Sequence, residues 1–74
     1  MKSVVIKGVA VTVGDIVTWA ERNGNRVAKK VKSVGKHFDS YTNETFSCVG
    51  VEHYGWGEIL ILEPDIVAIN GSEV

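Results

Sequence analysis

Apolar and polar residues alternate in the first part of the chain, as they do in a half-buried β-strand. Valine takes every second position from Val9 to Val13, and Val4 and Ile6 are spaced by two in the same way. The two runs are out of phase, and a lysine and a glycine separate them. Because the extra residue of a β-bulge reverses the alternation, we predict one bent strand over residues 3–13.

Asn23-Gly24 is the strongest turn signal of the chain. Both central residues of a type I′ turn need positive φ, which asparagine and glycine tolerate best. A two-residue hairpin at this point places Glu21 opposite Arg26, which is a favourable cross-strand pair. We therefore predict that the segment before the turn pairs with a strand over residues 26–34.

The same region also fits a pair of helices. Asp15 is a candidate N-cap for a first helix that Gly24 ends, and Asn25 is a candidate cap for a second helix with valines at helical spacing. This alternative predicts a helix-turn-helix over residues 15–35 that binds DNA. The connection between the two helices is very short and the first helix has barely two turns, so the pattern favours strands.

The second half of the chain has shorter apolar segments between turn signals. Residues 39–45 are polar and resemble a loop, and residues 46–53 alternate as a strand does. Residues 59–62 are apolar on both faces, which predicts the most buried strand. Pro64 interrupts the pattern because proline cannot donate to a sheet ladder, and residues 66–69 form a last short strand.

Composition supports the same fold class. Thirteen valines and six isoleucines stand against two leucines and four alanines. β-branched residues pack well on a pleated sheet and lose rotamer freedom in helices. With 74 residues there is room for one core. We predict an all-β fold, a small five-stranded, partly open barrel with few exposed edges, as a single domain over residues 1–71 with a frayed tail at residues 72–74.

Three segments carry a resemblance to a known superfold. They are residues 11–17, the hairpin around Asn23-Gly24, and residues 61–67, in which a short turn separates the last two strands. Their layout resembles the Src-homology-3-like small-barrel superfold, which includes translation-factor and KOW-type modules. The resemblance spans residues 9–70, and it implies a shape without a particular family or activity.

Basic and acidic residues are segregated along the chain. Residues 1–38 hold all eight lysines and arginines and two acidic residues, a net charge of +6. Residues 39–74 hold seven acidic residues and no lysine or arginine, a net charge of −7. This asymmetry either orients a charged partner or pairs the chain's own strands.

The basic residues form one candidate binding surface. In an extended strand Lys30 and Lys32 share a solvent-facing side, with Phe38 and Tyr41 further along the chain. Lysines beside aromatic rings are typical of nucleic-acid binding. Edge-strand lysines also prevent aggregation without any ligand, and a pI near 6.0 is unusual for a nucleic-acid binder. The candidate RNA or DNA contacts are Arg22, Arg26, Lys29, Lys30, Lys32 and Lys36.

An aromatic turn forms the other candidate surface. His53, Tyr54 and Trp56 lie within four residues of one another beside a glycine-flanked turn. Tyrosine and tryptophan dominate protein-binding hot spots because they bury a large area at small entropic cost. The alternative is that Trp56 folds back over the open end of the barrel. Trp19, within a strand, is expected in the core.

No catalytic set is recognisable. Gly55-Trp56-Gly57 lacks the spacing and the lysine of a phosphate-binding loop. Glu52 and His53 are adjacent in a predicted strand, so their side chains point to opposite faces. We therefore expect no enzymatic activity, no cofactor and no metal.

The expected location is the cytoplasm, of a cell or of a viral host. Cys48 is the only cysteine, which fits a reducing compartment. The N-terminal apolar run is too short for a signal peptide, and no segment has the length of a membrane span, so we expect no membrane partner.

These patterns favour a non-enzymatic interaction module. We expect it to dock on a larger protein through His53, Tyr54 and Trp56, as an accessory subunit, a regulator or an inhibitor, including a viral protein that acts on a host protein. Nucleic-acid binding through the basic segment 22–36 is the alternative.

Overall fold

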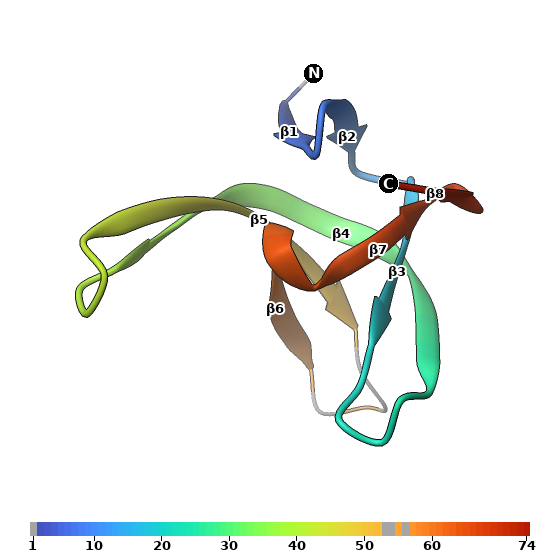
Figure 1. Cartoon of the computed structure of the whole chain (residues 1–74). Helices are drawn as coiled ribbons and strands as arrows, with labels where there is room; N and C mark the ends of the chain where they lie inside the picture. Colours follow the sequence, from blue (N-terminus) through green and yellow to red (C-terminus); the bar gives the residue numbers. More distant parts are fainter. Residues whose placement is uncertain (1, 53–54, 56) are drawn as a thin grey trace.

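The computed structural model describes residues 2–52, 55 and 57–74 and is all-β (Figure 1). Its elements are β1 (Ser3–Ile6), β2 (Val9–Thr12), β3 (Ile16–Ala20), β4 (Arg26–Asp39), β5 (Glu44–Glu52), β6 (Glu58–Leu62), the 3-10 turn η1 (Glu63–Asp65), β7 (Ile66–Ile69) and β8 (Ser72–Glu73). The prediction of an all-β fold is confirmed. The helix-turn-helix alternative is wrong, because residues 16–20 and 26–39 are paired strands.

The described strands form two open sheets. β1 and β2 make a separate hairpin, and the other six strands lie in the order β6-β5-β4-β3-β7-β8. The described residues therefore form eight strands where five were predicted. At the end of the chain β8 pairs with β7, and the Val74 amide donates to the Val67 carbonyl at 3.0 Å.

The N-terminal segment is a hairpin and not one bent strand. Lys7 and Gly8 have φ of 49° and 85°, and Ile6 lies opposite Val9, which defines a two-residue turn of type I′. This turn, and not a bulge, separates the two out-of-phase apolar runs. Its lysine fixes the turn to η1 and β7: the Lys7 amide donates to the Glu63 carboxylate at 2.6 Å, and Lys7 Nζ donates to the Ile66 carbonyl at 2.6 Å.

The β3–β4 turn differs from the predicted type I′ turn by one residue. Asn23 does not adopt positive φ, whereas Gly24 does, and the Glu21 amide bonds to the Asn25 carbonyl at 2.8 Å. This is the pattern of a three-residue loop, a type I turn followed by a left-handed glycine. The Asn23 side chain stabilises it by accepting the Asn25 amide at 2.9 Å.

The longer loop changes the partner of Arg26. Arg26 lies opposite Ala20 and not opposite Glu21, and Trp19 lies opposite Val27 and not opposite Ala28. Arg26 instead forms an ion pair with Glu73 at 2.5 Å, which lowers the pKa of that carboxyl. A type I′ turn, which was predicted at Asn23-Gly24, occurs instead at Asn70-Gly71, where both φ values are positive and Ile69 lies opposite Ser72.

The core is almost entirely β-branched. The β1–β2 hairpin contacts β4 and β5 and closes the core from one side. Trp19 is buried as predicted, and Cys48 is buried, which raises the pKa of its thiol. Residues 59–62, predicted as the most buried strand, form an edge strand in which Leu60 is 57% exposed. The fully buried side chains are Ile6, Val11, Val17, Val31, Val49, Val51 and Ile66.

Asp15 connects two turns that are distant in sequence. Its carboxylate accepts the Thr12 amide at 2.9 Å and lies 3.4 Å from the Asn70 side-chain amide. Asn70 in turn accepts the Ile16 amide at 2.9 Å. The Thr12 and Asn70 hydrogen bonds stabilise the charged carboxylate, so they lower the pKa of Asp15 below its ordinary value of 3.8.

This network predicts an acid-dependent loss of stability. Because folding lowers the pKa of Asp15, its contribution is complete above the ordinary value and is lost as the pH falls through the lower folded value. We expect Asp15→Asn to be less stable than the wild type at pH 7 and the difference to shrink below about pH 4. Urea unfolding at a series of pH values measures this, and parallel pH profiles for the two proteins contradict it.

Gly50 leaves room for a hydrogen bond across β5. It lies between Ser33 of β4 and Leu60 of β6, and the Ser33 hydroxyl bonds to the Glu58 carboxylate above it. A Cβ added at Gly50 overlaps with both of these side-chain ends, whereas nothing lies within 4 Å of a Cβ added at Gly35. The two interacting side chains are flexible, so the expected cost is the loss of their hydrogen bond.

We therefore expect Gly50→Ala to destabilise the protein by about 1 kcal/mol, the usual net value of one hydrogen bond. Gly35→Ala, at a position of the same strand pair with open space, is the matched control and is expected to be neutral. The penalty of Gly50→Ala is expected to shrink in a Glu58→Ala background. Chemical unfolding of the four variants tests this, and an equal penalty in both backgrounds is the opposing result.

Candidate functional site

A β-bulge in the middle of β4 decides which side chains face the core. The pairing of β4 with β5 shifts between Val31 and Ser33, so Lys32 is the inserted residue. Val31 is fully buried, and Val34, three positions on, also packs against the core. An uninterrupted strand places Val34 on the same side as Lys30 and Lys32, so the bulge moves it to the inner side.

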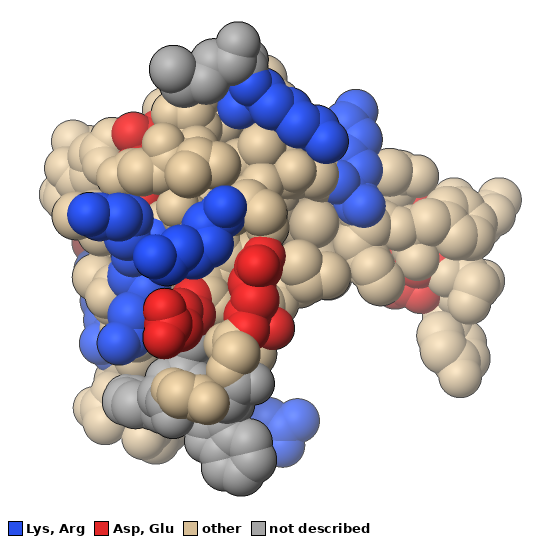
Figure 2. Space-filling view, turned by 180° about the vertical axis from the view of Figure 1, so that it is seen from behind, with Lys and Arg blue, Asp and Glu red and all other residues tan. Residues whose placement is uncertain are grey.

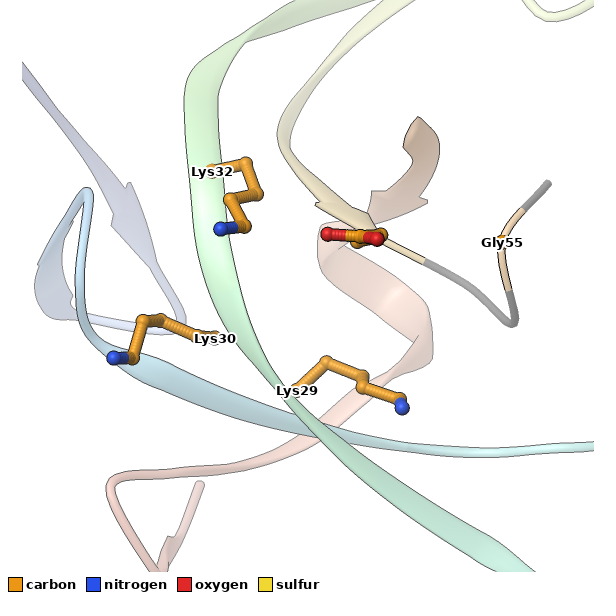
Figure 3. A pocket seen from close by; sticks show the side chains of 5 residues that line it. Lys29, Lys30, Lys32 and Gly55 are labelled. Carbon is orange, nitrogen blue, oxygen red and sulfur yellow. The ribbon is translucent and has the colours of Figure 1, made fainter. Parts of the chain in front are cut away.

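Three lysines of β4 line one hollow beside the bulge. The lysine hollow, as we call it, has a volume of about 320 Å³ and is lined by Lys29, Lys30, Lys32, Glu52 and Gly55. In Figure 3, Lys29 extends from β4 to the side of Gly55, Lys30 leaves β4 in the opposite direction, and the Lys32 side chain lies alongside β4. Lysine and arginine side chains gather on this face next to acidic ones (Figure 2).

The structure separates the other predicted nucleic-acid contacts from this hollow. Arg26 is engaged by Glu73, as described above. Arg22 lines a second, wider hollow at the β3–β4 turn, of about 640 Å³, together with Trp19, Ala20, Glu21, Asn23 and Asp65. Lys36 lies further along β4. Three of the six predicted basic contacts are therefore brought together, and three are not.

The second surface is a projecting ribbon, which sequence reasoning missed. β4 continues to Asp39 and β5 begins at Glu44, so the predicted loop over residues 39–45 is reduced to a turn over residues 40–43 at the end of a paired ribbon. We call residues 36–47 the arm. It extends away from the other strands (Figure 1), and it forms a largely uncharged projection in Figure 2.

Phe38 lies on the inner side of the arm, beyond the end of the core. It pairs with Thr45, and Val34 pairs with Val49. Residues separated by an even number of positions share a face, so Phe38 continues the side on which Val34 and Val49 pack. Val49 is fully buried, but Phe38 is 55% exposed. The arm thus carries an apolar side chain on the face that packs on the core elsewhere in the sheet, at a position that the core does not cover.

The tip of the arm presents a tyrosine. Tyr41 is 99% exposed. Its amide donates to the Asp39 carboxylate at 2.9 Å, and Asn43 adopts φ of 59°, so side-chain bonding and a left-handed residue fix the turn. One sequence signal could have identified this ribbon as paired. It is the pair of aromatic residues that flank the polar segment, Phe38 and Phe46.

The predicted aromatic turn lies outside the described residues. His53, Tyr54 and Trp56 are not described, so the proposal that they bind a partner stays a prediction. The neighbouring glycines are described: Gly55 and Gly57 have φ of 76° and 90°, the left-handed backbone that suits a tight turn.

No protein-family model matches the chain, and neither the curated proteins nor the solved structures compared with it give a match. Within the described part of the chain, no helix has the length and hydrophobicity needed to span a membrane.

The contrast between arm and core gives a stability prediction. Phe38→Ser removes an exposed ring, so we expect the free energy of unfolding to change by no more than about 0.5 kcal/mol. Ile66→Ala empties a fully buried site and is expected to cost about 2–5 kcal/mol. Urea unfolding of the two variants measures the difference. A large loss of stability in Phe38→Ser means that the ring is part of the core.

Proposed function

We propose that this protein is a non-enzymatic interaction module that docks on a larger protein through the arm. The observation that carries the proposal is the exposure of Phe38 and Tyr41 on a ribbon outside the core. Exposed aromatic rings cost solvation free energy, and burial in an interface recovers it. Such rings also lose little conformational entropy on binding, as in hot spots of protein interfaces.

The charge of the arm supports a protein partner over nucleic acid. Asp39 and Glu44 flank the turn that carries Tyr41, and Lys36 is the only lysine or arginine of the arm. Carboxylates beside an aromatic ring repel the phosphates that accompany a stacked base. Binding of RNA or DNA through the basic segment 22–36 stays a prediction. If it occurs, the affinity is expected to fall steeply with salt concentration, and the Lys30→Glu and Lys32→Glu changes are expected to abolish binding.

We also propose that the six-stranded sheet contains a Src-homology-3-like small barrel. The support is the order of five neighbouring strands, β6-β5-β4-β3-β7. The short turn η1 connects β6 to β7, and β7 returns to pair with β3 at the other side of the sheet. The β1–β2 hairpin and β8 are then additions to this unit. A role as accessory subunit, regulator or inhibitor of a larger assembly suits a small module with a projecting contact surface.

The aromatic turn is the second proposed anchor. Tyr54 and Trp56 are large rings next to glycines with left-handed backbone, and His53 precedes them. If Trp56 is an anchor, Trp56→Ala weakens partner capture while the melting temperature stays nearly unchanged. A collapse of the melting temperature identifies Trp56 as a core residue instead.

Site-specific photo-crosslinking tests docking through the arm. p-Benzoylphenylalanine placed at position 41 or 38 is expected to capture the same protein from a lysate of the source cells. The matched control is position 5, because Val5 is 57% exposed on the β1–β2 hairpin, away from the arm (Figure 1). The Phe38→Ser change is expected to reduce the adduct formed at position 41 by tenfold or more, roughly the loss of one hot-spot side chain.

Nuclease treatment of the lysate is expected to leave this adduct unchanged. Equal adducts from positions 41 and 5 contradict a specific arm surface. An adduct that nuclease abolishes indicates that nucleic acid recruits the chain, and it contradicts direct docking on a protein.

A further inference from the structure

We infer that β6 is the contact strand of a symmetric dimer, in which the open edge of this strand pairs antiparallel with the same edge of a second copy of the chain. β6 (Glu58–Leu62) is the end strand of the six-stranded sheet, and among the described strands only β5 pairs with it. An end strand presents a row of backbone amides and carbonyls with which a further strand can pair. This edge is separate from the arm, so the inference does not depend on docking through the arm.

β6 lacks the features that usually prevent an edge strand from pairing with another chain. Those features are lysines, prolines, bulges and a very short length. The sequence of β6 is Glu-Ile-Leu-Ile-Leu, and its five residues pair with β5 without a register shift. By contrast, β8 at the other end of the sheet has two residues, and the part of β4 beyond β3 contains the bulge at Lys32 and a second lysine, Lys36.

The exposed chemistry of β6 is apolar, which a second copy of the same strand matches. Leu60 is 57% exposed, whereas the adjacent Ile61 is 7% exposed. The residue opposite Leu60 on β5 is Gly50, which has no side chain to cover it. The only charged residue of β6, Glu58, already bonds to the Ser33 hydroxyl. The edge therefore gains from burial of the exposed leucine and offers no unengaged charge to a charged partner.

The hydrogen bonds of β4 determine which backbone groups of β6 point outward. The Val31 amide donates to the Asp15 carbonyl at 2.7 Å and the Val31 carbonyl accepts the Gly14 amide at 3.0 Å, so both groups point away from β5. Val31 lies opposite Val51, and Val51 lies opposite Ile59. Because the bonding direction alternates in an antiparallel ladder, Val51 and Ile59 bond to each other. The backbone groups at positions 58, 60 and 62 then point to the open side.

One antiparallel register pairs all five residues of β6 with the same five residues of a second copy. Its two-fold axis lies at Leu60, which is then opposite itself, and Glu58 lies opposite Leu62 of the second copy. The two Glu58 residues are about 13 Å apart along the strands, more than the Debye length of about 8 Å at physiological salt. An axis at Glu58 instead places the two carboxylates opposite each other, and an axis at Leu62 brings Pro64 into the ladder. β6 is thus self-complementary about Leu60, as a closed two-fold contact requires.

Sedimentation equilibrium of the whole chain measures the association. Between about 10 μM and 1 mM we expect a reversible equilibrium of monomer and dimer with a dissociation constant on the order of 100 μM, because two short strands bury less area than a standard interface. Leu60→Lys is expected to weaken the dimer about tenfold or more, since it places two lysines opposite each other. Val5→Lys is the matched control, because Val5 on β1 is also 57% exposed, and it is expected to change the constant by less than about twofold. Circular dichroism verifies that each variant is folded.

Cysteine crosslinking tests the register independently of the lysine variants. In the inferred dimer the Cα atoms of the two residues 60 are about 5.5 Å apart, within the range of a disulfide. Mild oxidation is therefore expected to link Leu60→Cys into a covalent dimer. Leu62→Cys alone is expected to stay monomeric on reducing-agent-free gels, and a mixture of Leu62→Cys with Glu58→Cys is expected to crosslink. The wild type, in which Cys48 is buried, gives the background.

Several results overturn the inference. A chain that stays monomeric up to 1 mM has no such contact, and equal weakening by Leu60→Lys and Val5→Lys places the contact elsewhere. Crosslinking of Leu62→Cys alone as efficiently as Leu60→Cys contradicts the register. A mass that grows beyond the dimer with concentration contradicts a closed pair. None of these outcomes changes the expected crosslinks from the arm, so a failure of the dimer is distinguished from a failure of docking.

Discussion

The bulge in β4 is the constraint on which the arrangement of both surfaces depends. β4 is the longest strand, and it pairs with β3 through its first residues and with β5 through the rest. Inserting Lys32 keeps Val31 and Val34 on the inner side although they are three positions apart. The same insertion lies beside the lysine hollow and, further along the strand, leaves Phe38 on the inner side beyond the core. One extra residue thus sets both the packing and the exposed chemistry.

The size of the chain explains why these surfaces lie outside the body of the protein. A domain of this length buries only about 60% of the surface that its unfolded chain exposes, so its core is small and consists mostly of valine and isoleucine side chains. The arm adds few buried residues, and a two-stranded ribbon without a third strand is only marginally stable in water. Stability alone gives no reason for such a ribbon with a tyrosine at its tip, and the docking function proposed above is consistent with it.

The ends of the chain are held by side chains that are far apart in sequence. Lys7 bonds to Glu63 and to the Ile66 carbonyl, and Asn70 joins the Asp15 turn to the start of β3. Arg26 reaches Glu73 in the last strand. Part of the charge segregation along the chain therefore serves its own folding, because the basic Arg26 of the first half pairs with the acidic Glu73 of the second.

Sequence alone determined the fold class and the punctuation of the strands. Valine and isoleucine in alternation predicted strands, because β-branched side chains pack on a pleated surface, and the chain turns at Gly14, Gly24 and Gly71, as their turn signals predicted. Burial of Trp19 was also predictable from its place within an apolar strand. These features depend on the conformational preferences of individual residues, which the sequence specifies directly.

The tertiary structure decided between backbone conformations that the local sequence allows equally well. A phase break is compatible with a bulge or with a hairpin, and only the contacts of Lys7 with Glu63 and Ile66 distinguish the two at Lys7-Gly8. Asn-Gly occurs twice, but only Asn70-Gly71 forms the type I′ turn, because the three-residue loop at Asn23 lets Arg26 reach Glu73. Strand register and the length of the arm depend on hydrogen bonds between distant segments, and alternation along one segment does not encode them.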